Sequence, residues 1–146
     1  MTTPQTRQFD ARREVFEELR GFVEGYCAAA GVAQATVDVL MLICEELFEN
    51  STRHGYRAAQ GSASAQPIWL SLAVNGNGID TVYEDAAPEF NPFAKVNVPD
   101  YSGPPETWRV GGLGIPLILE LSRNLRYTRT DGRNRISFTV PLASGA

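Results

Sequence analysis

The sequence has few of the residues that build disulfides, metal centres or membrane spans. It contains two cysteines and one histidine, and no apolar run approaches membrane-spanning length. Cys27 and Cys44 stand apart in apolar helical settings, so reduced core thiols are expected rather than a disulfide or a metal site. The first ten residues lack the apolar core of a signal peptide. Together these absences predict a cytoplasmic protein.

Basic charge is also in short supply. The 146 residues include 13 Lys and Arg against 17 Asp and Glu, which gives a formal net charge of -4. That balance argues against nucleic acid and against an anionic membrane as partners, since both bind basic surfaces. With 43% hydrophobic and 21% charged residues, the composition is that of a globular protein, and we expect one domain over residues 1–146.

Apolar residues at helical spacing predict two helices in the first third of the chain. Asp10 is the expected N-cap of the first helix, and Gly31 is a typical stop signal. The second helix is expected to end at Gly55. The apolar stripes are Phe16, Leu19, Val23, Tyr26 and Ala30 in the first helix, and Val37, Leu40, Met41, Cys44, Leu47 and Phe48 in the second.

Alternating apolar residues predict two β-hairpins after a small, polar loop at residues 58–67. In the first hairpin, residues 68–74 and 79–85 flank an Asn-Gly-Asn-Gly turn. In the second, residues 124–130 and 135–142 flank an Asp-Gly turn. Both turn sequences favour tight connections between antiparallel strands.

Between the hairpins lies a long segment, residues 86–114, that is rich in proline and glycine. Long loops inside compact domains are usually functional. A short third helix is expected over residues 115–123. The order of elements predicts an α+β two-layer sandwich, with about three helices on one face of a mixed, mostly antiparallel sheet.

The end of the second helix, residues 45–56, is unusually polar for a buried helix. Glu46, Asn50 and Arg53 line one stripe, because residues three and four apart share a helix face. In this alignment the carboxylate can accept a hydroxyl proton, the amide oxygen can ligate a metal, and the guanidinium can bind a phosphate. The other interpretation is a solvated face with a Glu–Arg pair four residues apart, as most charged helix faces are.

Asp85 stands where a predicted strand opens into the long loop. Strand ends of this kind commonly carry ligand contacts. A carboxylate at such a place can accept a hydrogen bond from an exocyclic amine, such as that of adenine. The other interpretation is an ordinary turn aspartate.

Residues 110–118, Val-Gly-Gly-Leu-Gly-Ile-Pro-Leu-Ile, place three glycines directly before an apolar helix. Glycine lets backbone amides approach an anion closely, and a helix N-terminus adds partial positive charge. The segment is not a Walker loop, since no Gly-Lys-Ser/Thr follows, and no strand leads into it as in the dinucleotide fingerprint. It predicts a phosphate cradle or, on the other interpretation, a flexible loop that ends at a helix.

Taken in order, these stretches resemble the nucleotide-binding boxes of the GHKL ATPase superfamily, and within it the bacterial anti-sigma-factor serine/threonine kinase branch. Residues 45–56 resemble the N box, with Glu46 and Asn50 in its E-x-x-x-N positions. Residues 85–92 resemble the box that reads adenine, and residues 111–115 resemble the glycine-rich box after the ATP lid. The resemblance covers nearly the whole chain, and three weak motifs in this order and spacing are together specific.

The resemblance implies the Bergerat fold, with ATP between the helical layer and a lid over residues 93–110. It implies that Asn50 ligates Mg²⁺, that Glu46 is the general base and that Asp85 holds the adenine amine. The remaining implied contacts are to the phosphates, from the backbone amides of Gly112, Leu113 and Gly114 and from the side chains of Arg53 and Arg109.

Two positions depart from the family pattern. Ala87 replaces the glycine of the usual Asp-x-Gly, and its methyl group is expected to narrow the backbone's approach to the base and to reduce affinity. Near the last strand, where many relatives carry a threonine, this chain offers Arg135. On the first helix, Arg20 lies where the branch places an arginine used in partner docking, although a solvated charge is the other interpretation.

The predicted function is that of an ATP- and Mg²⁺-dependent serine/threonine kinase in transcription regulation. It would phosphorylate a STAS-domain anti-sigma-factor antagonist and sequester a sigma factor, and the resemblance also suggests a homodimer. The alternative is a non-catalytic regulatory binding module of a partner-switching system, which Ala87 favours. A detached histidine-kinase catalytic domain is disfavoured, because His54 is the only histidine and lies inside the N box.

Overall fold

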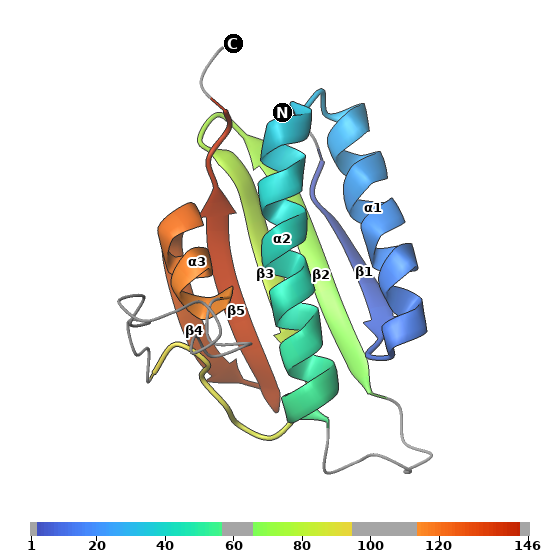
Figure 1. Cartoon of the computed structure of the whole chain (residues 1–146), viewed down its shortest axis with the longest axis vertical. Helices are drawn as coiled ribbons and strands as arrows, with labels where there is room; N and C mark the ends of the chain where they lie inside the picture. The colour runs from blue at the N-terminus through green and yellow to red at the C-terminus, as the bar shows by residue number, and fades with distance from the viewer. Residues whose placement is uncertain (1–2, 57–65, 95–113, 144–146) are drawn as a thin grey trace, which may run out of the picture.

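In the described part of the chain, five strands form one sheet, and three α-helices cover one of its faces (Figure 1). This computed structural model describes residues 3–56, 66–94 and 114–143. The strand order is β1-β2-β3-β5-β4. The strands are β1 (Gln5–Asp10), β2 (Pro67–Asn75), β3 (Gly78–Asp85), β4 (Arg123–Thr130) and β5 (Arg133–Val140), and the helices are α1 (Phe16–Ala29), α2 (Gln34–Asn50) and α3 (Gly114–Leu121).

The two-layer α+β architecture is confirmed, with one correction to the sheet. Each of the four strand pairings within the described residues is antiparallel, so this sheet is not mixed. None of the described helices is long and apolar enough to cross a membrane.

The N-terminal strand β1 was not predicted, and the proposed cap at Asp10 is wrong. Strand β1 pairs with β2, and Asp10 ends it opposite Pro67. The chain then passes through a 3₁₀ turn, η1 (Arg13–Val15), before α1 begins, and Val15 at the N-cap position makes no side-chain cap bond. Only Phe9 of β1 is buried, because the strand lies at the sheet edge, and a single buried residue leaves no alternation to detect.

The predicted turns are confirmed by their backbone angles. Gly31 ends α1 with φ of 72°. Gly78 begins β3 with φ of 143°, and a methyl group there would overlap the carbonyl oxygen of Val140. Asp131 and Gly132 join β4 to β5 with φ of 52° and 74°, the pair of positive angles that a type I′ turn requires.

The core lies between the sheet and the three helices. Both cysteines are free and fully buried in it, as expected. Alternate residues of β2, β3 and β5 face the helices, and each large apolar side chain buried there contributes about 1.5–3 kcal/mol. The largest fully buried side chains of the helices and the sheet are Tyr83, Leu19, Leu40, Ile43, Leu47, Ile68, Leu70, Leu72, Ile79 and Ile118.

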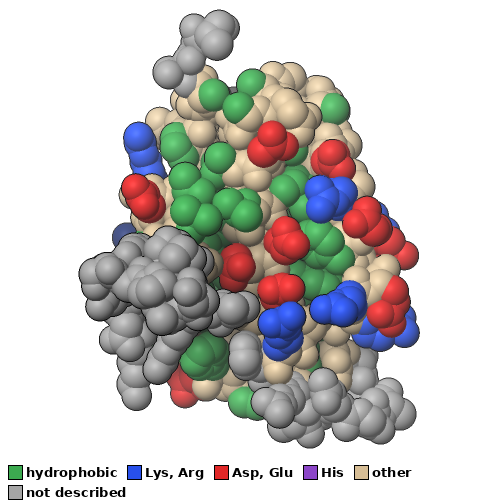
Figure 2. Space-filling view, viewed as in Figure 1, with side chains coloured by type: hydrophobic (Ala, Val, Ile, Leu, Met, Phe, Trp, Pro, Cys, Tyr) green, Lys and Arg blue, Asp and Glu red, His purple; other side chains and the backbone are tan. Residues whose placement is uncertain are grey.

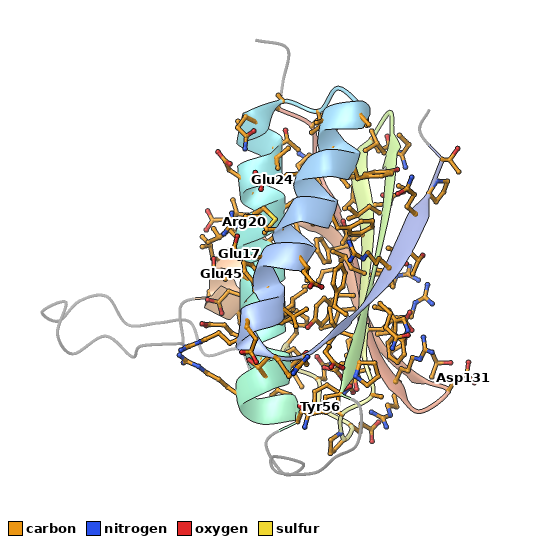
Figure 3. The ribbon with its side chains drawn as sticks, turned by 90° about the vertical axis from the view of Figure 1, so that its right-hand side faces the viewer. Glu17, Arg20, Glu24, Glu45, Tyr56 and Asp131 are labelled. Atoms are coloured by element: carbon orange, nitrogen blue, oxygen red, sulfur yellow. The ribbon has the colours of Figure 1, made fainter. Side chains whose placement is uncertain are left out.

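The end of α2 is joined to the sheet through Tyr56. Helix α2 widens into a π-helical turn, η2 (Ser51–Gly55), closed by the Tyr56 N–H bonding to the carbonyl of Ser51 at 2.8 Å. The Tyr56 hydroxyl donates to the carbonyl of Pro67 at 2.5 Å and accepts from the N–H of Ala86 at 2.7 Å. Figure 3 shows Tyr56 at the lower end of the sandwich. It therefore fixes η2 against the start of β2 and the end of β3.

Replacing Tyr56 with phenylalanine should destabilise this end of the fold. Burial raises the pKa of Tyr56 to about 12, so the hydroxyl keeps its proton at neutral pH. Its removal leaves the Ala86 N–H and the Pro67 carbonyl without this partner. We expect the free energy of unfolding, measured by urea denaturation, to fall by about 1–3 kcal/mol.

Tyr26→Phe is the matched control. The Tyr26 hydroxyl also bridges two backbone groups, but over longer distances, 3.1 Å to the carbonyl of Thr3 and 3.3 Å from the N–H of Val74. Its loss should therefore cost less. Equal losses in the two variants would contradict the special role of Tyr56.

Candidate functional site

A cluster of buried polar side chains lies where β3 leaves the sheet, with the Asp85 carboxylate at its centre. Oδ2 of Asp85 accepts a hydrogen bond from the Ser51 hydroxyl at 2.8 Å. Oδ1 accepts from the Asn134 amide at 2.9 Å and from the N–H of Ala87 at 3.2 Å. Asp85 is only 9% exposed, and a buried carboxylate is costly unless donors surround it. The three donors hold this side chain in one orientation.

The donor on Oδ2 belongs to a short relay between the layers. Ser51 begins the π-helical turn, and its Oγ lies 2.7 Å from the Tyr83 hydroxyl. Because Ser51 donates its proton to Asp85, the Tyr83 hydroxyl donates to Ser51. Burial raises the pKa of Tyr83 well above its ordinary value, so this phenol stays protonated. Hydrogen bonds therefore run from Tyr83 through Ser51 to Asp85.

Asn134, which faces Asp85 across the β3–β5 ladder, is the second unexpected member of the cluster. Its side chain is 6% exposed and bonds to Asp85 as well as to the loop that follows β3. Arg135, by contrast, pairs in register with Glu84, so it lies on the opposite face of the sheet. The polar residue of the last strand that reaches the site is thus Asn134, and not Arg135.

A small cavity of about 30 Å³ opens at this cluster. Asn50 of α2 and Asp85 of β3 both line it, so two of the predicted site residues meet here. Phe90 and Pro92, from the described part of the loop after β3, form another wall. The complete lining is Leu47, Asn50, Ser51, Gly55, Tyr83, Asp85, Phe90, Pro92, Asn134 and Ile136.

Glu46 lies one turn before Asn50 and contacts the start of α3. A methyl group added to Gly114 would overlap the Glu46 carboxylate, so only glycine leaves room for it at this point. Burial and the nearby carboxylates of Glu49 and Glu45 raise the pKa of Glu46, while Arg53 lowers it. A carboxyl group with a raised pKa is a stronger base than an ordinary glutamate.

Ala87, the departure from the family pattern, turns its side chain toward the π-helical turn. A methyl group added to Gly55 would lie 3.1 Å from the Ala87 Cβ. Ala87 is 1% exposed and is not among the residues that line the small cavity. Gly55 thus provides the space that the Ala87 methyl group occupies.

Arg53 lines a different hollow, a groove between α1 and α2 with a volume of about 420 Å³. Its guanidinium lies 3.9 Å from the Glu49 carboxylate, which is the Glu–Arg pair expected of a solvated face. Figure 3 shows Glu17, Arg20 and Glu45 along this side of the helices, and Figure 2 shows charges of both signs interspersed over it. Arg20 pairs with Glu17 at 3.7 Å, and such exposed pairs contribute little to stability.

Three of the predicted phosphate contacts, Arg109, Gly112 and Leu113, lie outside the described residues. The described part of the chain contains no group of three or more His, Cys, Asp or Glu side chains arranged to hold a metal ion. A divalent cation bound here would rest on the Asn50 amide oxygen and on phosphate oxygens, and oxygen ligands of this kind suit Mg²⁺.

Sequence reasoning missed Ser51 and Asn134, although both carry a detectable signal. Ser51 lies four residues after Leu47, on the buried stripe of α2. Asn134 lies two residues before Ile136, on the inward-facing alternation of β5. In both cases the signal is a polar residue at a position where the pattern demands an apolar one.

The family of the chain follows from a comparison with known proteins. A family model described as a histidine kinase-like ATPase domain matches residues 9–140, which include every described member of the site. The chain belongs to the histidine kinase-like ATPase family. No curated protein matches it in sequence.

The fold of this ATPase-family chain is also found among solved structures. It is similar to the crystal structure of the RsbU and RsbW domains of Rv1364c from Mycobacterium tuberculosis, with a TM-score of 0.65 and 17% sequence identity. The match covers 99% of this chain and 34% of that one, so the chain spans about a third of the length of the protein it matches. At this identity the likeness concerns the fold alone.

The contact between Gly55 and Ala87 in this ATPase-family site predicts a pair of compensating substitutions. Gly55→Ala should lower the free energy of unfolding by about 1–3 kcal/mol, because the new methyl group overpacks against Ala87. The double variant Gly55→Ala, Ala87→Gly should recover most of that loss. Urea denaturation of both single variants and the double variant measures the coupling. Strictly additive losses would show that the two positions do not share this space.

Proposed function

We propose that the chain binds ATP with Mg²⁺ and transfers the γ-phosphoryl group to a serine or threonine of a STAS-domain anti-sigma-factor antagonist. In its other binding state it sequesters a sigma factor in the cytoplasm. The observation that carries the proposal is the convergence of Asn50 and Asp85 on one cavity, with Glu46 one helical turn away. Membership of the histidine kinase-like ATPase family supports ATP as the nucleotide. The fold likeness to a protein with an RsbW domain supports a STAS-domain protein as the partner.

Asp85 is proposed to read the base. The two hydrogen bonds that Oδ1 accepts and the one that Oδ2 accepts leave an acceptor position on Oδ2 for the 6-amino group of adenine. The cavity of about 30 Å³ is far smaller than the 300–1,000 Å³ typical of ligand pockets. We propose that the Phe90 side chain, which is 53% exposed, turns outward when a purine enters.

Glu46 is proposed to serve as the general base. It would take the proton of the attacking hydroxyl as the new oxygen–phosphorus bond forms and the bond to the leaving ADP oxygen breaks. Mg²⁺, when bound, would neutralise charge on the phosphates, and the Asn50 amide oxygen is proposed to hold it. The raised pKa of Glu46 favours this proton transfer.

The partner surface is proposed to include Arg20, on the exposed side of α1, and a homodimer is proposed on the family resemblance alone. A purely regulatory binding module is the second candidate. Its main support in the sequence was the Ala87 methyl group, which packs on Gly55 instead of lining the cavity. In the described part of the chain, the Ala87 methyl group therefore does not support this second candidate.

Replacing Glu46 with glutamine should abolish proton transfer while preserving shape. Base catalysis typically contributes 10²–10⁴-fold, so single-turnover transfer from labelled ATP to a STAS-domain partner should slow by about that factor. ATP affinity should hold or rise, because a negative charge near the triphosphate is removed. In the wild type the rate should increase with pH through the raised pKa of Glu46, and this acid limb should vanish in Glu46→Gln.

Glu45→Gln and Glu49→Gln are the matched controls, because both residues lie on α2 but project off the Glu46–Asn50 stripe. Both should stay active. Gly114→Ala is a second test from the other side of the contact, since its methyl group displaces the Glu46 carboxylate and should slow transfer with little change in thermal stability. Wild-type rates in Glu46→Gln, or equal losses in all three glutamine variants, would remove the catalytic role.

Asp85→Asn should weaken adenine nucleotides selectively, because an amide is a poorer acceptor than a carboxylate and can present a donor to a donor. The loss of a hydrogen bond to a charged group costs about 1.5–3 kcal/mol. Calorimetry with ADP and inosine diphosphate, which has a carbonyl in place of the 6-amino group, separates base reading from phosphate binding. The preference for ADP should shrink in the variant. An unchanged ratio would mean that Asp85 is an ordinary turn aspartate.

A further inference from the structure

Both polar atoms of the Asn134 side chain, Nδ2 and Oδ1, form hydrogen bonds within the protein. Its Nδ2 donates to Asp85 Oδ1 at 2.9 Å, to the carbonyl of Pro88 at 3.0 Å and to that of Ala87 at 3.3 Å. Its Oδ1 accepts from the N–H of Phe90 at 3.0 Å and from the Tyr127 hydroxyl at 2.5 Å. One buried side chain thus joins three segments, namely the end of β3, the loop after it and the edge strand β4.

The orientation of this amide is decided by its neighbours. A rotated amide would direct its oxygen at a carboxylate and two carbonyls, and its N–H groups at the Phe90 N–H. Asn134 must therefore be a donor to Asp85. It is a neutral donor, so it holds the carboxylate without the charge that an arginine or a lysine would bring into the cavity.

Because of the Asn134 bond, the two carboxylate oxygens of Asp85 differ in how many hydrogen bonds they accept. Oδ1 already accepts two hydrogen bonds, from Asn134 and from the N–H of Ala87, which fills its lone pairs. Among the described residues, Oδ2 accepts only the Ser51 hydroxyl. If the Asn134 bond were lost, Oδ1 would also have an open position, and only the Ser51 hydroxyl and the Ala87 N–H would hold the carboxylate.

We propose that Asn134 is the positioning residue for purine selection: it saturates Oδ1 of Asp85 so that Oδ2 alone reads the 6-amino group of the base. This inference rests on the proposed ATP-binding function and names the residue that enforces its selectivity. The same amide oxygen holds the backbone of Phe90, a wall of the cavity. Asn134 therefore sets the reading atom and the adjacent wall together.

Asn134→Thr and Asn134→Val form the decisive pair, because they share a shape and differ in one hydroxyl donor. Both lose the amide bonds to the loop, so both should be less stable than the wild type. Threonine can still donate to Oδ1, and the ratio of ADP to inosine diphosphate affinity should stay near the wild-type value. Valine cannot, so Asp85 should hold the 6-amino group less well. The ratio should then fall by about tenfold, near the lower end of the effect of a lost hydrogen bond to a charged group.

Tyr127→Phe is the control for general damage to the network. It removes the bond on the far side of the Asn134 amide and leaves the bond to Asp85, so the affinity ratio should not change. Asn134→Ser and Asn134→Ala repeat the comparison with smaller side chains in case the valine variant does not fold.

The outcomes separate the two proposals. A wild-type protein that binds ADP and inosine diphosphate equally would overturn base reading by Asp85, and with it the proposed nucleotide function. A wild-type preference for ADP that persists in both hydroxyl-free variants, or that falls equally in Tyr127→Phe, would overturn the role of Asn134 alone.

Discussion

The hydrogen bond from the Ser51 hydroxyl to the Asp85 carboxylate joins the helical layer to the sheet, and the geometry of the site depends on it. Removing a carboxylate from water is expensive, and an unsatisfied buried charge is more expensive still. Three donors compensate here, and among the described residues no buried side-chain polar atom lacks a hydrogen-bond partner. Because each donor comes from a different element, the position of Asp85 is fixed only when both layers are assembled.

The π-helical turn is the local feature that allows the hydrogen bond between Ser51 and Asp85 to form. A turn with one additional residue per hydrogen bond changes the direction of the chain as α2 leaves the sandwich, and such turns are frequent at functional sites. Within it Ser51 points to the sheet, Gly55 admits the Ala87 methyl group, and Tyr56 closes the turn against the strands. The departure at Ala87 is thus matched by a glycine 32 residues earlier, because a methyl group on Gly55 would lie only 3.1 Å from the Ala87 Cβ.

Helix α2 serves two purposes because its faces are chemically different. Leu47 packs in the core, while Glu46 lies against the first residue of α3 and Asn50 borders the cavity. Burial and two neighbouring carboxylates act together to raise the pKa of Glu46, and Arg53 opposes them only in part. The general base proposed at this position is therefore tuned by burial and by neighbouring carboxylates of its own helix.

The sequence by itself determined the elements whose signals are local: the two long helices and both hairpins with their glycine turns. These elements are encoded in apolar periods of 3.6 and 2 residues and in the residue types of the turns, all of which can be recognised in a single sequence. The sequence also placed Glu46 and Asn50 on one polar stripe, but Arg53, predicted for the same stripe, lines a different hollow. It also placed Asp85 at a strand end. Only the tertiary structure decided that β1 adds an edge strand, that Glu46 meets Gly114, and that Asn134 rather than Arg135 faces Asp85. Each of these depends on contacts or strand register between segments that are distant in sequence, and a shift of one residue in register reverses which side chains face the core.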